Sequence, residues 1–98
     1  MTQKIRKIYP AKAQVSALEM NCIALTEPDI QEWDNGVEYK AKTVVKVENL
    51  NNGKVIDLVI WKNFNVHKGD TIHTVGKLEQ TGKAFIGWSD YTTIIKRA

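Results

Sequence analysis

The residue with the clearest chemical potential is a tryptophan at the end of an alternating segment. Trp61 closes residues 55–61, in which isoleucine or leucine occupies every second position. This alternation is typical of a strand with one buried face, and it places the indole on the face opposite the aliphatic side chains. An indole held in that way is either surplus core, packed on Phe64 of the following connector, or a platform on which a nucleobase stacks.

Lysines gather on the outer face predicted for the preceding segment. In residues 37–48 one face carries Val37, Tyr39, Ala41, Thr43, Val45 and Val47, and the other carries Glu38, Lys40, Lys42, Val44, Lys46 and Glu48. The pattern predicts a half-buried strand that places Tyr39 with the core. Lysines attract phosphate and an indole stacks on bases, the combination that binding of single strands requires. A solvated strand face is the alternative for the lysines.

Patterns for catalysis and metal binding are absent from the sequence. It has no glycine-rich phosphate loop, no Gly-x-Ser-x-Gly and no His-Glu-x-x-His. Cys22 is the only cysteine, and His67 and His73 lack partners at ligand spacing, so we expect a buried thiol, no metal and no cofactor. Asp57 and Asp70 are not expected to form a catalytic pair, because Asp70 falls in a turn. We therefore expect neither enzymatic activity nor a small-molecule substrate.

Length and composition favour one small globular domain over residues 1–98. The chain is 43% hydrophobic and 26% charged, with a net charge of +3. Residues 1–38 carry −2 and residues 39–98 carry +5, an asymmetry that points to a polyanionic partner for the second part. No apolar run approaches the ~18 residues of a membrane helix, and the basic N-terminus lacks the apolar core of a signal peptide. We expect a cytoplasmic, intracellular protein that does not contact membranes.

The segments around these residues predict an all-β fold with little helix. Residues 1–12 are expected to form an arm or a short helical turn. Residues 26–36 are expected to form an acidic loop between strands one and two, with Trp33 serving as a plug or protein contact more than a groove residue. Strands are expected at residues 15–25, 37–48, 55–61, 71–78 and 85–95, the last broken near Ser89 and Asp90. A small closed or partly closed barrel is the natural way to hide their edges.

Several of these segments resemble a known family. The run from Gly53 to Trp61, followed by Lys68-Gly69-Asp70, residues 75–78 and Gly82-Lys83, resembles the OB-fold domains of the replication protein A type, which bind single-stranded DNA. The resemblance covers roughly residues 37–95. It implies a five-stranded Greek-key barrel, a role in replication, and a base stacked on Trp61. The further positions that it implies on the groove are Asp57, Val59, Lys40, Lys42, Lys46, His73 and Lys77.

One part of the sequence departs from this family. The family places a second stacking aromatic between strands four and five, where this chain has Glu79-Gln80-Thr81-Gly82. Trp88 is a candidate substitute, with a core position as its alternative. The departure keeps two other readings open: a protein-interaction subunit of a replication or phage assembly, or a homodimer, and an RNA- or tRNA-binding domain.

Overall fold

The computed structural model describes residues 17–98 of the chain. The arm or helical turn expected for residues 1–12 lies outside the described residues. The described part contains seven strands and one short 3₁₀ helix, namely β1 (Leu18–Ala24), β2 (Asp29–Asp34), β3 (Tyr39–Asn49), β4 (Val55–Ile60), β5 (Thr71–Leu78), β6 (Ala84–Gly87), η2 (Ser89–Tyr91) and β7 (Thr93–Lys96). Its one helix is too short to cross a membrane.

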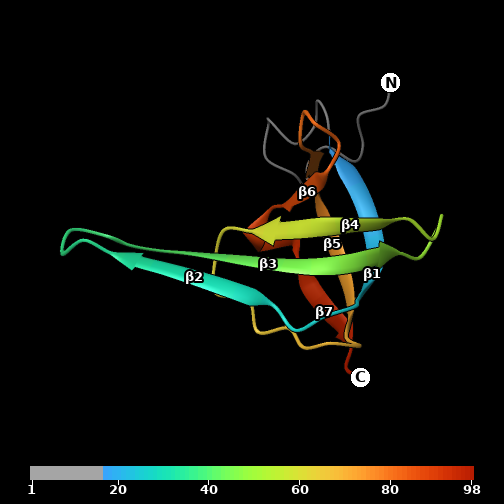
Figure 1. Cartoon of the computed structure of the whole chain (residues 1–98), viewed down its shortest axis with the longest axis horizontal. Helices are drawn as coiled ribbons and strands as arrows, with labels where there is room; N and C mark the ends of the chain where they lie inside the picture. The colour runs from blue at the N-terminus through green and yellow to red at the C-terminus, as the bar shows by residue number, and fades with distance from the viewer. Residues whose placement is uncertain (1–16) are drawn as a thin grey trace.

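Five of the strands close into a barrel (Figure 1). The order around it is β1-β3-β4-β6-β5, and β5 returns to pair with β1. The β4–β6 pair is parallel and the other pairs are antiparallel. These directions are compatible with an OB-fold, and the predicted all-β, five-stranded barrel is confirmed. Two strands lie outside it, since β2 pairs with β3 and β7 pairs with β5.

Alternation along the strands fills the barrel with apolar side chains, as predicted. Val45 on β3 faces Leu58 on β4 in the pairing register, and both are at most 1% exposed. Cys22 on β1 is fully buried, and burial raises the pKa of its thiol to about 12. The expectation of a buried thiol is therefore confirmed. The predicted break near Ser89 and Asp90 is also present, because η2 separates β6 from β7.

Two expectations for residues 26–39 are wrong. The expected loop contains β2, because Asn35 and Gly36 close a hairpin that pairs residues 29–34 with the start of β3. Gly36 adopts a φ of +86°, which suits a tight turn. Tyr39 is 57% exposed, not part of the core. The reason is that β3 outruns the barrel, so its first residues have only β2 beside them in the hairpin that projects to the left in Figure 1.

The connector between β4 and β5 plugs the barrel without a helix. Phe64 and Val66 insert into the core from it. The Thr43 hydroxyl donates to the Lys62 carbonyl at 2.6 Å and accepts from the Phe64 amide at 2.9 Å. This pair of bonds fixes the chain immediately after Trp61.

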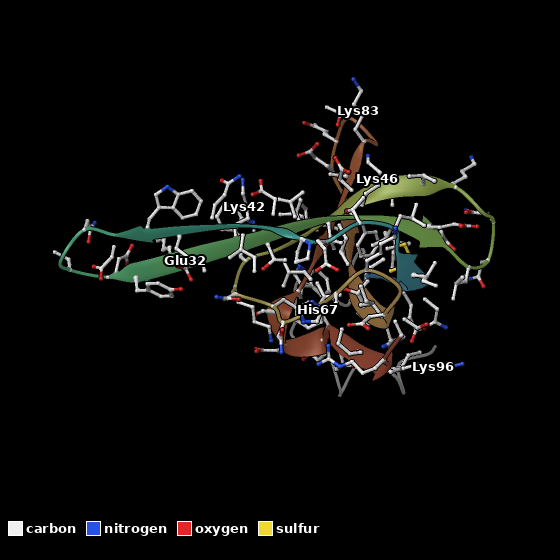
Figure 2. The ribbon with its side chains drawn as sticks, turned by 60° about the horizontal axis from the view of Figure 1, so that its bottom comes forward. Glu32, Lys42, Lys46, His67, Lys83 and Lys96 are labelled. Atoms are coloured by element: carbon white, nitrogen blue, oxygen red, sulfur yellow. The ribbon has the colours of Figure 1, made fainter. Side chains whose placement is uncertain are left out.

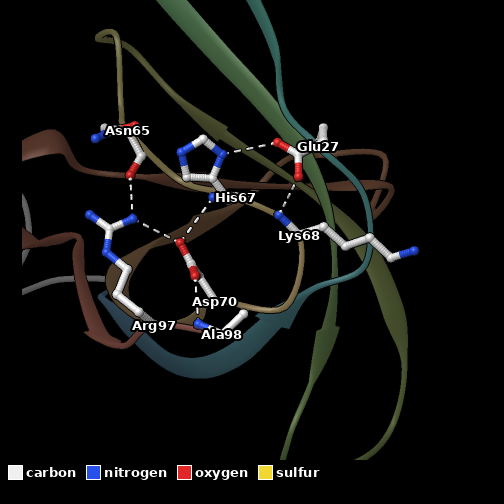
Figure 3. A network of polar contacts seen from close by, with 7 residues as sticks. All are labelled: Glu27, Asn65, His67, Lys68, Asp70, Arg97 and Ala98. Carbon is white, nitrogen blue, oxygen red and sulfur yellow. Dashed lines mark hydrogen bonds and ion pairs between the residues drawn. The ribbon is translucent and has the colours of Figure 1, made fainter.

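Asp70 ties the end of this connector to the last residues of the chain (Figure 3). Its carboxylate is 2% exposed and accepts hydrogen bonds from the backbone amides of His67 and Ala98 and from the Arg97 guanidinium, each at 2.9 Å. The Ala98 amide is the main cause that lowers the pKa of this carboxyl. Glu27 holds the same region, because its carboxylate accepts from the Lys68 amide at 3.0 Å, which lowers its pKa.

Candidate nucleic-acid interface

The outer side of β3, β4 and β6 forms a surface with an apolar floor. Val44, Val59 and Ile86 stand opposite one another in the pairing registers and are half-buried. Because alternate residues of a strand share a face, the neighbouring outward positions belong to the same surface. We call it the tryptophan face, formed by Lys42, Val44, Lys46, Asp57, Val59, Trp61, Ile86 and Trp88.

Trp61 stands at one end of this face, directly after the last residue of β4. Its side chain is 55% exposed, although the Thr43 bonds to residues 62 and 64 fix its backbone neighbours. The Lys42 ammonium lies over the indole, 5.2 Å from the ring centroid, at cation–π distance. A hollow of about 240 Å³ adjoins the ring and is also lined by Ile86, Trp88 and Tyr91.

The indole of Trp61 packs on a residue other than the one considered from the sequence. Phe64 is buried in the core, and Trp61 instead stacks on Trp33 of β2. The two ring centroids are 6.2 Å apart and the planes are inclined by 25°. Trp33 is itself 46% exposed, so the pair lies at the surface.

Trp88 lines the face from the turn after β6. Its backbone amide donates to the Val75 carbonyl at 2.9 Å, and its carbonyl accepts from the Thr92 hydroxyl at 2.8 Å. Thr92 is buried and hydrogen-bonded to Thr74 at 2.7 Å, which anchors the turn to β5. Trp88 is half-buried, which is intermediate between the two alternatives that the sequence left open, a core residue and a groove residue.

The lysines of the face are partly compensated by acids. Lys46 pairs with Asp57 at 3.1 Å, directly across β3 and β4. Lys40 pairs with Glu38 at 3.1 Å, beyond the end of the barrel. Exposed pairs of this kind are worth about 0.2–1 kcal/mol, so a phosphate can displace the carboxylate at small cost.

The cations outside the tryptophan face do not all lie on the same side of the molecule. Lys77 on β5 stands opposite Ile86 of β6, at the rim. In Figure 2, Lys42, Lys46 and Lys83 lie on one side of the ribbon, and His67 and Lys96 lie on the other. The tryptophan face therefore has several cations on its own side.

His73 is set apart from this surface. It stands between β1 and β7, opposite Asn21 and Thr93, and neither of these strands carries the tryptophan face. Its ring lies 2.7 Å from a Glu19 carboxylate oxygen. The structure thus brings together most of the predicted positions but separates His73 from them.

Sequence reasoning missed three contributors to the face or its surroundings. Ile86 lies on its floor, Tyr91 lines the hollow, and Lys83 projects from the β5–β6 turn. The alternation within residues 84–88 was a usable signal for Ile86, because the buried residues Phe85 and Gly87 alternate with the half-buried residues Ile86 and Trp88. No local pattern indicated Tyr91, whose position depends on η2.

Residues 17–98 contain no group of three or more His, Cys, Asp or Glu side chains arranged to hold a metal ion. Comparisons of the chain with protein-family models, with curated proteins and with solved structures find no match. The geometry and charge of the tryptophan face are the features that bear on function.

Proposed function

We propose that this protein binds single-stranded nucleic acid, DNA in preference to RNA, on the tryptophan face and without catalysing a reaction. The observation that carries the proposal is the Trp61 ring, which is 55% exposed with the Lys42 ammonium 5.2 Å from its centroid. A stacking plane with an adjacent cation serves the base and the phosphate of one nucleotide together. Stacking of this type contributes about 1–3 kcal/mol per base and tolerates any sequence.

The floor and rim of the face support an extended ligand. Val44, Val59 and Ile86 offer half-buried apolar surface, and the hollow beside Trp61 leads to Trp88. Lys46 and Lys77 stand at opposite margins, on β3 and β5. Bases would lie along the apolar floor and phosphates would follow the lysines.

Replacement of the platform tests this proposal. We expect Trp61→Ala to weaken binding of a deoxythymidine oligomer by at least about fivefold, the equivalent of one stacked base, while Trp61→Phe retains most of it. Binding is measured by fluorescence anisotropy of a labelled oligomer, and circular dichroism checks that the fold survives. Equal binding by the parent and Trp61→Ala, or no binding by either, contradicts the proposal.

A matched pair of lysine variants locates the phosphate contacts. Lys42→Ala removes the ammonium over Trp61, whereas Lys96→Ala removes an exposed lysine on the other side of the ribbon (Figure 2). Both variants change the net charge by the same amount. A weaker affinity for Lys42→Ala alone supports the face, and equal losses would indicate attraction by overall charge.

The β2 edge favours a second candidate function, a protein-interaction domain. All six residues of β2 are exposed, and within the described residues β2 pairs with β3 alone. A free strand edge is a template for strand addition by a partner. Tight association with a protein, together with the absence of salt-dependent oligomer binding, would favour this candidate.

Comparison of deoxyuridine and uridine oligomers tests whether the 2′-hydroxyl is read.

A further inference from the structure

The strand β2 turns Trp33 away from most of the acids that surround it in the sequence. Because β2 alternates, Trp33 shares a face with Gln31 and Asp29, and the pairing register sets these residues opposite Lys40, Lys42 and Val44 of β3. Ile30, Glu32 and Asp34 occupy the opposite face. Trp33 therefore lies on the same side of the hairpin as Lys42 and the rest of the tryptophan face.

The acids near Trp33 are also engaged by other groups. The Glu32 carboxylate accepts from the Tyr39 hydroxyl at 2.7 Å and from the Asn63 amide at 3.0 Å. The Asp34 carboxylate accepts from the Gly36 backbone amide at 2.9 Å. Glu38 forms an ion pair with Lys40, and Lys40 stands directly opposite Trp33 in the β2–β3 register. These bonds hold the Glu32 and Asp34 carboxylates toward their partners, and the charge of Glu38 is compensated by Lys40.

The stacked pair of Trp33 and Trp61 can hold a base between its rings if the rings move apart. A base between two rings needs them about 7–8 Å apart, two contact distances of roughly 3.5–4.0 Å. The centroids of the stacked rings are 6.2 Å apart, so a base enters between them only if the hairpin moves Trp33 away from Trp61. The hairpin that carries Trp33 projects beyond the barrel, with β3 as the strand partner of β2, so such a movement leaves the core intact.

We infer that Trp33 is a second stacking residue, and that one base of a single strand inserts between Trp33 and Trp61. This inference rests on the proposed function. The phosphates flanking that base would lie beside Lys40 and Lys42. The hollow of about 430 Å³ beside Trp33 and Lys40 is also lined by Glu32, Asp34 and Glu38, so phosphates would follow the lysines toward the barrel and not this end of the hairpin.

The affinities of the parent and four variants for a deoxythymidine oligomer test this inference. We expect Trp33→Ala and Trp61→Ala each to weaken binding at least about fivefold. The double variant should lose less than the product of the two effects, because both rings contact the same base. Ile30→Ala, on the opposite face of β2, is the control and should bind like the parent.

Photocrosslinking separates direct contact from an indirect effect on Trp61. An oligomer containing 5-bromodeoxyuridine, irradiated with the parent protein, should give crosslinked peptides that contain Trp33 and peptides that contain Trp61. Crosslinks at Trp61 alone, or a Trp33→Ala variant that binds as well as or better than the parent, overturn the inference and leave the proposed function standing. If the parent itself fails to bind, both fall together.

Discussion

Asp70 joins the β4–β5 connector to residues 97 and 98 through one carboxylate. It accepts from the connector at His67, from the Arg97 side chain and from the Ala98 amide, and it is 2% exposed (Figure 3). A buried carboxylate is tolerated when its oxygens are hydrogen-bonded in this way. The ionised form is the one that these donors favour, which is why the pKa of Asp70 lies below its ordinary value of 3.8.

Acid titration of stability tests this role. In the pH range between the folded pKa and 3.8, the unfolded chain binds more protons at this residue than the folded one, so stability rises with pH through that range. The contribution is full above the range and is lost on acidification. We expect Asp70→Asn to lower the urea midpoint at pH 7 and to flatten its dependence on pH below about 4.

The control is Asp29→Asn, because Asp29 is exposed on β2. Urea midpoints are followed by circular dichroism from pH 2.5 to 7. Parallel midpoint curves for the parent and Asp70→Asn would contradict the assignment.

The strands β5 and β6 approach each other closely at Gly76. A Cβ added at Gly76 would lie 1.8 Å from the Ile86 carbonyl oxygen, so the strands can approach as they do only because residue 76 has no side chain. Ile86 belongs to the floor of the tryptophan face. The same glycine therefore affects both barrel closure and the shape of the candidate site.

Substitution at Gly76 should disturb both barrel closure and the shape of the tryptophan face. We expect Gly76→Ala to lower the free energy of unfolding by about 1–3 kcal/mol or more, because backbone must move to admit the methyl group. Lys77→Ala, an exposed change on the same strand, should alter stability by no more than about 0.5 kcal/mol. Urea unfolding of the two variants measures the difference. Similar midpoints for Gly76→Ala and Lys77→Ala would show that β5 and β6 can move apart without loss of stability.

The whole molecule separates its charges in space as well as in sequence. Within residues 26–38, which carry the projecting strand β2, all five charged residues are acidic. Most lysines of residues 17–98 belong to the barrel and its turns and connector, and several lie on the side of the tryptophan face (Figure 2). Under the proposed function, a single strand approaching this molecule would be attracted to the barrel and guided toward its lysine-bearing side.

This arrangement predicts a measurable salt dependence. If Lys42, Lys46, Lys77 and Lys83 neutralise three to four phosphates, the logarithm of the association constant should fall with the logarithm of salt concentration with a slope of roughly −2 to −3. Titrations of a deoxythymidine oligomer between 50 and 300 mM salt, about a sixfold range, would give this slope. A slope near zero would contradict contact between these lysines and phosphate.

Much of the barrel was predictable because its signals are local. Alternation in residues 55–61 and 71–78 depends only on neighbours two positions apart, and both segments contain the expected strands. Leu58 and Ile60 are buried as the first pattern predicts, whereas in the second segment Val75 is buried and Leu78 is exposed, against the alternation. The hairpin turn before β4 and the interruption near Ser89 follow from short turn and breaker signals in the same way. Tyr39 was misplaced because the alternation of β3 continues past the point where the barrel ends.

Strand periodicity is a local property of the chain, and it was enough to place Trp61, Lys42 and Val59 at outward positions of their strands. Which outward residues share one surface depends on the tertiary structure. Barrel closure places Ile86 beside Val59 and moves His73 to the side of β1 and β7. Pairing of β2 with β3 sets Trp33 on Trp61. These neighbours are fixed by register and strand order, which join residues that are distant in the sequence.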